Sequence, residues 1–284
     1  MNTARFVIAS PSVAAVVDGC GSELVSITDA AGRELLWDGG PQWPWHAPLL
    51  FPTIGRVVDD EIEHDGRRYP MPRHGFGRDQ LFDLIEKTPT STHLQLVPSP
   101  TTKEHFPFDF VLDVRHSVTA ASVTSQYTVT NISEVTLPVS LGVHPAFPWP
   151  AGQRDQWRIE LDTVEDGQAY HLADVLLADT TPNPVRERTL DLAEELFATG
   201  ALVLIQCRST SLRLLGPDMA ITLSWDGFEH ITVWSPVDAD LLCVEPWSGY
   251  PSPVGFEADI LGKPGQQLLA PGEHRTWSYT ITVE

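Results

Sequence analysis

The sequence contains few cysteines and few basic residues. Its 284 residues include three cysteines, Cys20, Cys207 and Cys243, which are far apart and form no C-x-x-C motif. This pattern excludes a small disulfide scaffold and a zinc ribbon, and it favours a reducing compartment such as the cytoplasm. Lys and Arg total 18 against 38 Asp and Glu, a formal charge of −20. Such a surface repels phosphate backbones and anionic lipids, so we expect no nucleic-acid partner and no membrane association.

Long apolar runs are also missing. No apolar stretch approaches the ~20 residues needed to span a bilayer, because Asp18 and Gln206 interrupt the longest candidates. The first 19 residues contain Pro11 and precede no A-x-A cleavage site, so we interpret them as a first strand or hairpin rather than a signal peptide. A G-x-S-x-G elbow, a P-loop and a dinucleotide fingerprint are absent, which argues against a serine hydrolase and a nucleotide-binding protein.

What the sequence does contain is the two-residue alternation of half-buried strands. Apolar residues occupy even positions at Phe110, Leu112 and Val114, and polar residues occupy odd positions at Asp113 and Arg115. The same alternation recurs at 123–129, 157–161, 221–225 and 277–283, and the Asp-Gly pairs at 65–66 and 226–227 predict hairpins between such runs. With no linker of low complexity, the chain is expected to form one domain over residues 1–284, a large antiparallel β-sandwich.

One segment, residues 189–200, predicts a short helix. Leu192 and Leu196 are one turn apart, Asp191 and Glu194 can form a capping pair, and Gly200 is suited to the end. The expected fold class is therefore all-β with one or two short helices.

Four segments break the alternation, and each combines a titratable side chain with Gly, Pro and an aromatic residue. They are 46–56 (HAPLLFPTIGR), 72–82 (PRHGFGRDQLF), 142–150 (GVHPAFPWP) and 243–253 (CVEPWSGYPSP). Gly and Pro fix an unusual backbone path and the aromatic ring supplies a flat apolar wall, so a His or Glu between them is held in place. These segments are the candidate site.

Together the four segments resemble the aldose 1-epimerase (galactose mutarotase) superfamily, in particular its LacX-like and hexose-phosphate epimerase-like branch. The motifs that carry the resemblance are LFPTIGR, HGFGR, HPAF and EPWSG, in that order, and the likeness covers most of the chain. It implies a many-stranded galactose mutarotase-like supersandwich and no cofactor. It also implies that the α and β anomers of a small-molecule aldose are interconverted by a monomer or homodimer.

Opening a pyranose ring requires a proton to leave the C1 hydroxyl while another reaches the ring oxygen. The resemblance implies that Glu245 is the base and His144 the acid, with His74 as a second donor and Arg56 on a sugar hydroxyl. We expect Glu245 and His144 to lie on opposite sides of a cleft about one pyranose ring wide. Arg78 would brace His74, pair with Asp79 or meet an anionic substituent on the sugar.

Three tryptophans lie beside the motifs: Trp149, Trp234 and Trp247. Each is either a core residue or a contact for the apolar face of a sugar. We assign Trp247 to substrate binding. Galactose mutarotases also carry an Asp between the catalytic His and Glu. Asp174 and Asp179 match this Asp by order only. The NHxYF signature is replaced by GVHPAF, and Gly77 stands where LacX-like proteins usually have Ala. The preferred sugar therefore stays open.

Two other functions stay open. A hexose-phosphate 1-epimerase would need cations around the phosphate, for which Arg56, Arg73 and Arg78 are the candidates. A sugar-binding module would keep the contacts without catalysis. No metal is expected, because His74, His144 and Glu245 have no local partner at metal-ligand spacing. A glycosidase would need two placed carboxylates, and only Glu245 stands out.

Overall fold

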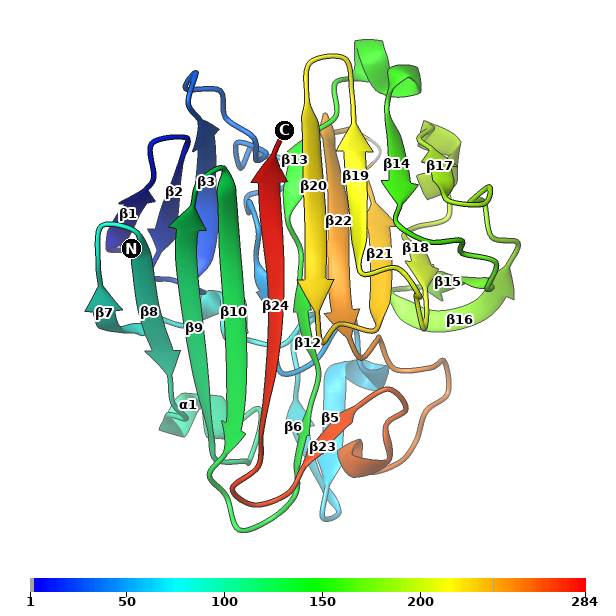
Figure 1. Cartoon of the computed structure of the whole chain (residues 1–284). Coiled ribbons are helices and arrows are strands. Elements are labelled where there is room, and N and C mark those ends of the chain that lie inside the picture. The colour runs from blue at the N-terminus through cyan, green and yellow to red at the C-terminus, as the bar shows by residue number, and fades with distance from the viewer. Residues whose placement is uncertain (1–2, 237) are drawn as a thin grey trace.

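The computed structural model describes residues 3–236 and 238–284, and most of its strands belong to two large sheets (Figure 1). One sheet has nine strands in the order β17-β14-β19-β20-β24-β10-β9-β8-β7. The other has eight, in the order β16-β15-β18-β21-β22-β12-β4 with β13 also paired to β22. Neighbouring strands within both sheets are antiparallel. The predicted all-β antiparallel sandwich is confirmed.

The nine-stranded sheet contains β7 (Asp83–Lys87), β8 (Ser91–Leu96), β9 (Phe110–Thr119), β10 (Ser122–Asn131), β14 (Arg158–Leu161), β17 (Thr189–Asp191), β19 (Ser211–Leu215), β20 (Ala220–Asp226) and β24 (His274–Val283). The eight-stranded sheet contains β4 (Leu49–Leu50), β12 (Leu141–Val143), β13 (Ala146–Pro148), β15 (Ala169–Ala173), β16 (Leu176–Thr181), β18 (Leu202–Leu204), β21 (His230–Trp234) and β22 (Leu241–Ser248).

Smaller sheets pair β1 (Arg5–Ala9), β2 (Val13–Asp18) and β3 (Glu23–Asp29), then β5 (Glu61–His64) with β6 (Arg67–Pro70), and β11 (Leu137–Val139) with β23 (Gln267–Leu269). The helical segments are α1 (Pro100–Lys103) and five 3₁₀ turns, at Val58–Asp60, Gly77–Asp79, Ala151–Gln156, Glu194–Phe197 and Ile260–Gly262. No helix in the described ranges is both long and apolar enough to cross a bilayer.

The N-terminal segment forms the predicted hairpin of β1 and β2, although Met1 and Asn2 lie outside the described residues. Asp65-Gly66 turns β5 into β6, as predicted, and both residues have positive φ. The hairpin predicted at Asp226-Gly227 is wrong. That turn connects β20 of one large sheet to β21 of the other, so the chain changes layers there.

Only part of the helix predicted over residues 189–200 is helical. Its first three residues form β17, and Glu194–Phe197 makes a single 3₁₀ turn whose N-cap is Ala193. The predicted capping pair of Asp191 and Glu194 is wrong, because Glu194 instead accepts a hydrogen bond from Arg154 at 2.5 Å. The ion pair with Arg154 and the strand pairing of β17 outweigh a weak local helical preference.

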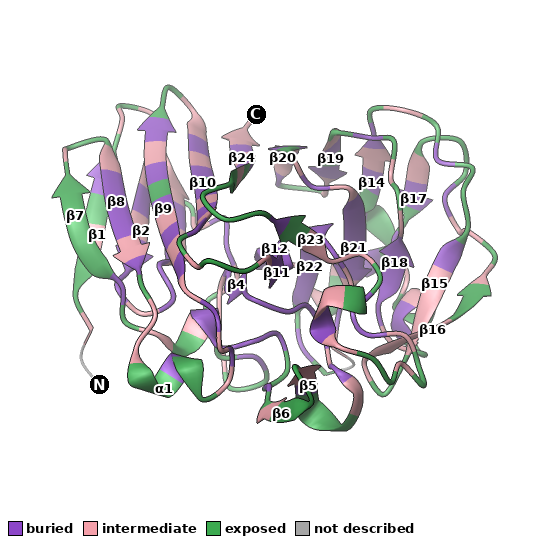
Figure 2. Cartoon of the chain, turned by 90° about the horizontal axis from the view of Figure 1, so that it is seen from below, coloured by how far each residue is buried: buried purple, intermediate pink, exposed green. Residues whose placement is uncertain are grey.

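The core lies between the two large sheets, where buried residues from both layers gather (Figure 2). Leu242 and Val244 of β22 belong to this core together with Leu223 and Trp277 of the nine-stranded sheet. Since successive side chains of a strand point to opposite faces, the odd-numbered residues of β22 face away from it. The outer face of the eight-stranded sheet is therefore free to form a site.

Candidate active site

A cavity of about 390 Å³ lies on this outer face, and two of the odd-numbered side chains of β22 line its floor. Glu245 and Trp247 come from β22, and Thr232 and Trp234 from the adjacent β21, in which Thr232 is the register partner of Glu245. The volume is within the usual range of about 300–1,000 Å³ for small-molecule sites. The lining combines indole rings with imidazoles, guanidiniums and carboxyls, which suits a polar ligand with an apolar face.

His144 reaches the same floor because of strand register. It lies in the short break between β12 and β13, both of which pair with β22. Gly142 is opposite Trp247 before the break and Ala146 is opposite Cys243 after it, so one register holds throughout and places His144 opposite Glu245. Directly opposed residues of antiparallel strands have Cβ atoms about 4.5–5.5 Å apart. Contact between these two side chains follows from the fold.

The observed contact is closer than the sequence suggested. Nε2 of His144 lies 3.1 Å from Oε2 of Glu245. The prediction that these two side chains are separated by the width of one pyranose ring is wrong. It assumed that the two proton transfers need groups on opposite sides of the sugar. The C1 hydroxyl and the ring oxygen of an aldopyranose are bonded to the same carbon, so the groups that serve them can be neighbours.

Burial controls the protonation of this pair. Glu245 is 1% exposed and His144 6% exposed. Burial raises the pKa of Glu245 well above its usual value, against the opposing effects of the Trp247 indole and the Arg73 guanidinium. It also lowers the pKa of His144 to about 3, with Arg78 and Arg73 acting in the same direction. Burial therefore favours the uncharged forms of both side chains, the protonated carboxyl of Glu245 and the neutral imidazole of His144.

His74 is fixed by the backbone around it. Its φ of 67° is unusual for a residue other than glycine, and its main chain exchanges hydrogen bonds with Gly55 (2.7 Å) and Phe51 (3.1 Å). The Gly55 N–H also donates to Nδ1 of His74 at 3.1 Å, so a neutral His74 carries its proton on Nε2. Burial, with nearby His144, lowers the pKa of His74 well below its usual value. His74 is thus a neutral donor in the cavity lining.

Aromatic rings surround the imidazole of His144. The ring centroids of Trp43 and Trp234 lie 5.1 Å and 5.9 Å from it, and that of His74 lies at 5.8 Å. Trp247, which we predicted to contact the sugar, lines the cavity beside Gly142, where a Cβ would come within 2.8 Å of the indole. A side chain at position 142 would therefore displace the indole of Trp247.

Two arginines from the segment after β6 also line the cavity. Arg78 places its guanidinium 4.5 Å from the ring centroid of Trp45 and donates from Nη2 to the Arg73 carbonyl at 3.1 Å. Its Nε is buried without a hydrogen-bond partner, and the nearest carboxylate oxygen, of Asp79, is 3.8 Å away. Within the described ranges Arg73 forms no ion pair. Two cations thus face the cavity with little local compensation.

Arg56 lies elsewhere than predicted. It is not among the described residues that line the cavity; its guanidinium binds Asp60 at 2.7 Å and also Asp174. Asp174 itself lines the cavity, at the turn between β15 and β16, and the Arg56 N–H donates to the Val175 carbonyl at 3.2 Å. Arg56 therefore holds this turn against the cavity. Asp179, the other Asp considered, is exposed on β16 and does not line it.

Trp43 and Trp45 are lining residues that sequence reasoning missed. The segment QWPWH, two tryptophans around a proline just before the first motif, was the available signal. Trp149 is fully buried and packs on Phe197 at 5.7 Å, outside the cavity lining.

The profile of the family described as aldose 1-epimerase matches residues 5–282. The chain belongs to the aldose 1-epimerase family. Protein LacX (plasmid) of Lactococcus lactis subsp. lactis is 30% identical over 281 residues, with 93% of this chain and 94% of that protein covered. The chromosomal LacX of the same organism is equally similar.

Solved structures confirm the fold of this aldose 1-epimerase family member. A galactose mutarotase-like protein from Lactobacillus casei superposes with a TM-score of 0.94 at 28% identity, covering 99% of this chain and 100% of that one. A galactose mutarotase related enzyme from Lactobacillus acidophilus gives 0.91 at 24% identity, covering 99% and 97%. The galactose mutarotase-like fold is thus established along the whole chain, and membership in the family implies a carbohydrate epimerase.

Proposed function

We propose that this cavity interconverts the α and β anomers of an aldose by general acid–base catalysis, with Glu245 and His144 as the exchanging pair. The observation that supports it is their contact at 3.1 Å on the cavity floor, where burial raises the pKa of the Glu245 carboxyl and lowers that of the His144 imidazole. Ring opening and reclosure need a pair that holds one proton, accepts one and donates one. A pair that is fully protonated or fully deprotonated could not do so.

In the proposed reaction the sugar lies with C1 above the pair and an apolar face on the tryptophans. The bound sugar donates hydrogen bonds to Glu245 and so stabilises the charged carboxylate. The proton of Glu245 therefore moves to His144. Glu245 then takes the proton of the C1 hydroxyl as His144 protonates the ring oxygen. The C1–O5 bond breaks and the C1 aldehyde forms. Rotation about C1–C2 and reversal of the two transfers close the ring on the other face.

Other lining residues position the sugar in this proposal. The Nε2–H of His74 donates to the ring oxygen or a neighbouring hydroxyl, and Asp174, held by Arg56, accepts from a hydroxyl at the mouth. Neither a metal nor a cofactor takes part. Each proton transfer contributes about 10²–10⁴ in rate, which is sufficient for a reaction that already proceeds unaided in water.

Glu245→Gln tests the proposal. The amide keeps the shape of the side chain but cannot accept the C1 proton, so anomer exchange of a panel of free aldoses should vanish in saturation-transfer NMR while the fold is retained. Wild-type exchange by Glu245→Gln would refute the assignment. A wild-type protein that binds sugar in calorimetry without speeding exchange would instead be a carbohydrate-binding protein.

A phosphorylated substrate is the second candidate, and it is favoured by one observation. In a chain of net charge −20, Arg73 and Arg78 both line the cavity; Arg73 forms no ion pair among the described residues, and Arg78 has only the Asp79 carboxylate, at 3.8 Å. Guanidinium groups are well suited to phosphate oxygens. If this candidate is right, glucose 6-phosphate should exchange faster than glucose, and Arg73→Gln should remove the difference. Equal rates would favour the neutral sugar.

A further inference from the structure

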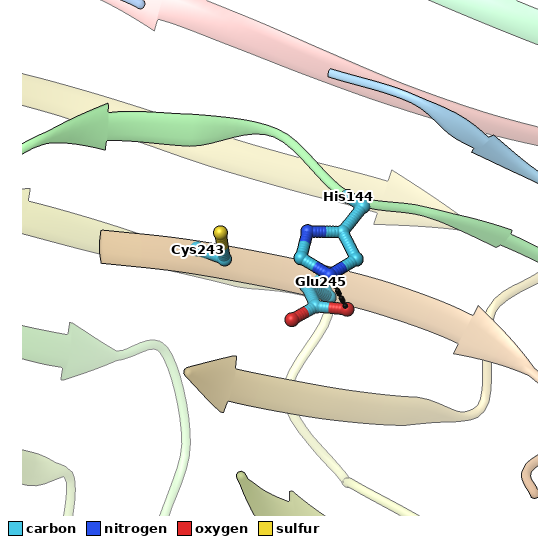
Figure 3. Close-up of side chains that lie close together, drawn as sticks. All are labelled: His144, Cys243 and Glu245. Atoms are coloured by element: carbon cyan, nitrogen blue, oxygen red, sulfur yellow. Dashed lines mark ion pairs between the residues drawn. The ribbon is translucent and has the colours of Figure 1, made fainter. Parts of the chain in front are cut away.

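Cys243 lies beside the proposed catalytic pair but has no role in it. It stands two residues before Glu245 on β22, so its side chain points to the same face of the sheet, and it is completely buried. One ligand atom each from His144, Cys243 and Glu245 lie within 4.8 Å of one another (Figure 3). An imidazole nitrogen, a thiol sulfur and a carboxyl oxygen therefore lie near enough for one ion to draw them together by small side-chain movements.

The contact between His144 and Glu245 leaves polar atoms of both side chains without a hydrogen bond. Although Nε2 and Oε2 are 3.1 Å apart, Oε2 is buried without a hydrogen-bond partner among the described residues, as is Nδ1 of His144. Two ligands bound to one zinc ion at about 2.0–2.2 Å in a tetrahedral arrangement lie roughly 3.4 Å apart. The two atoms thus need little movement to share an ion.

We propose that His144, Cys243 and Glu245 bind one zinc ion, and that the bound ion inhibits anomer exchange. Cysteine, histidine and carboxylate are the ligands that zinc uses in proteins, and three of them leave a fourth coordination position open. Binding occupies the lone pairs of Nε2 and of the carboxylate, so neither group can exchange a proton with a sugar. The thiol and the carboxyl release their protons to solvent when the ion binds.

A second group with metal-ligand atoms, His64, Asp65 and Asp259, is a weaker candidate. Its imidazole is already hydrogen-bonded to Asp259 at 3.2 Å, it contains no thiol, and Asp65 is exposed. The presence of sulfur distinguishes the two sites, and the experiment uses this difference.

Binding is tested on the full-length protein freed of metal, by titration with Co²⁺ and Zn²⁺. We expect the near-ultraviolet thiolate-to-cobalt charge-transfer band, and X-ray absorption of the zinc-loaded protein should show one sulfur at about 2.3 Å from the ion. Cys243→Ser and Cys243→Ala should lose the band and bind zinc at least tenfold more weakly in calorimetry. Cys207→Ala, which removes a half-buried thiol elsewhere, should match the wild type.

Zinc bound without a sulfur neighbour, or unchanged affinity in both Cys243 variants, would overturn the site. The wild-type spectra decide this even if a variant fails to fold. The inhibitory half of the proposal rests on the proposed function: anomer exchange should fall as zinc is added and recover with a chelator. Exchange that continues in zinc-saturated protein would overturn that half. Because the spectra do not depend on activity, a protein that never exchanged anomers would refute the function and leave the metal site standing.

Discussion

Gly142 on β12 lies directly opposite Trp247 on β22, so the backbone of one strand passes close to the indole of the other. A Cβ at position 142 would lie 2.8 Å from Cδ1 of Trp247 and 3.1 Å from Leu50. The absence of a side chain at this position therefore sets the place of one cavity wall.

Gly142→Ala should displace this indole into the cavity. We expect KM for the sugar to rise and stability to fall by about 1–3 kcal/mol, the usual cost of overpacking. Gly152→Ala is the matched control, since a Cβ there meets nothing within 4 Å. Steady-state kinetics and urea unfolding measure the two effects. An unchanged KM in Gly142→Ala would mean that this wall does not contact the sugar.

His144→Asn should lower kcat by about 10²–10⁴, because the amide cannot deliver a proton to the ring oxygen. The control is His274→Asn, on an exposed histidine of β24, which should retain wild-type exchange. Both are followed by saturation-transfer NMR, with circular dichroism to verify the fold. Retention of full activity by His144→Asn would assign the acid role elsewhere, with His74 as the next candidate.

Arg56→Ala should raise KM severalfold and leave kcat nearly unchanged. Loss of its guanidinium frees Asp174 and the turn between β15 and β16, which we assign to sugar binding rather than to proton transfer. Arg213→Ala removes a comparable exposed pair, with Glu284, and neither residue lines the cavity. Each loss should change the free energy of unfolding little, as is usual for exposed ion pairs. A fall in kcat alone for Arg56→Ala would contradict the positioning role.

Lys263 should make stability depend on alkaline pH. It is buried, its Nζ donates to the Tyr250 carbonyl at 2.5 Å, and burial lowers its pKa from 10.5 to about 7. Between these values the unfolded chain binds a proton that the folded chain lacks. The free energy of unfolding should therefore rise with pH, by up to about 1.4 kcal/mol per pH unit.

Urea unfolding of wild type and Lys263→Met between about pH 7.5 and 9.5 isolates this effect from other titrating groups. The difference in unfolding free energy between the two proteins should change with pH in favour of the wild type. A difference that is constant over this range would show that Lys263 keeps an ordinary pKa in the folded protein.

Local signals in the sequence were sufficient for the sandwich and for the segments that carry the site. Alternation in residues such as Phe110 and Leu112 reports which face of a strand is buried, and this depends only on neighbours along the chain. The short motifs located His74, His144 and Glu245, which all line one cavity.

Register and layer crossing could not be predicted in the same way. The contact of His144 with Glu245 depends on the pairing of strands about a hundred residues apart, which no local pattern encodes. The Asp226-Gly227 turn looks the same in sequence whether it closes a hairpin or leads to another sheet. The family resemblance assigned Arg56 to a sugar hydroxyl, and its pairing with Asp174 could not be predicted because the two residues are 118 positions apart in the sequence.

The alternation of side chains along β22 also places the residues that stabilise the fold and those that line the cavity on opposite faces of one strand. Leu242 and Val244 pack in the core, whereas Trp247 of β22 and Trp234 of the adjacent β21 line the cavity. A combinatorial library restricted to the outward positions could therefore explore new sugar preferences without loss of folding yield. This aldose 1-epimerase family member offers a starting point for engineering in which selectivity and robustness are tuned independently.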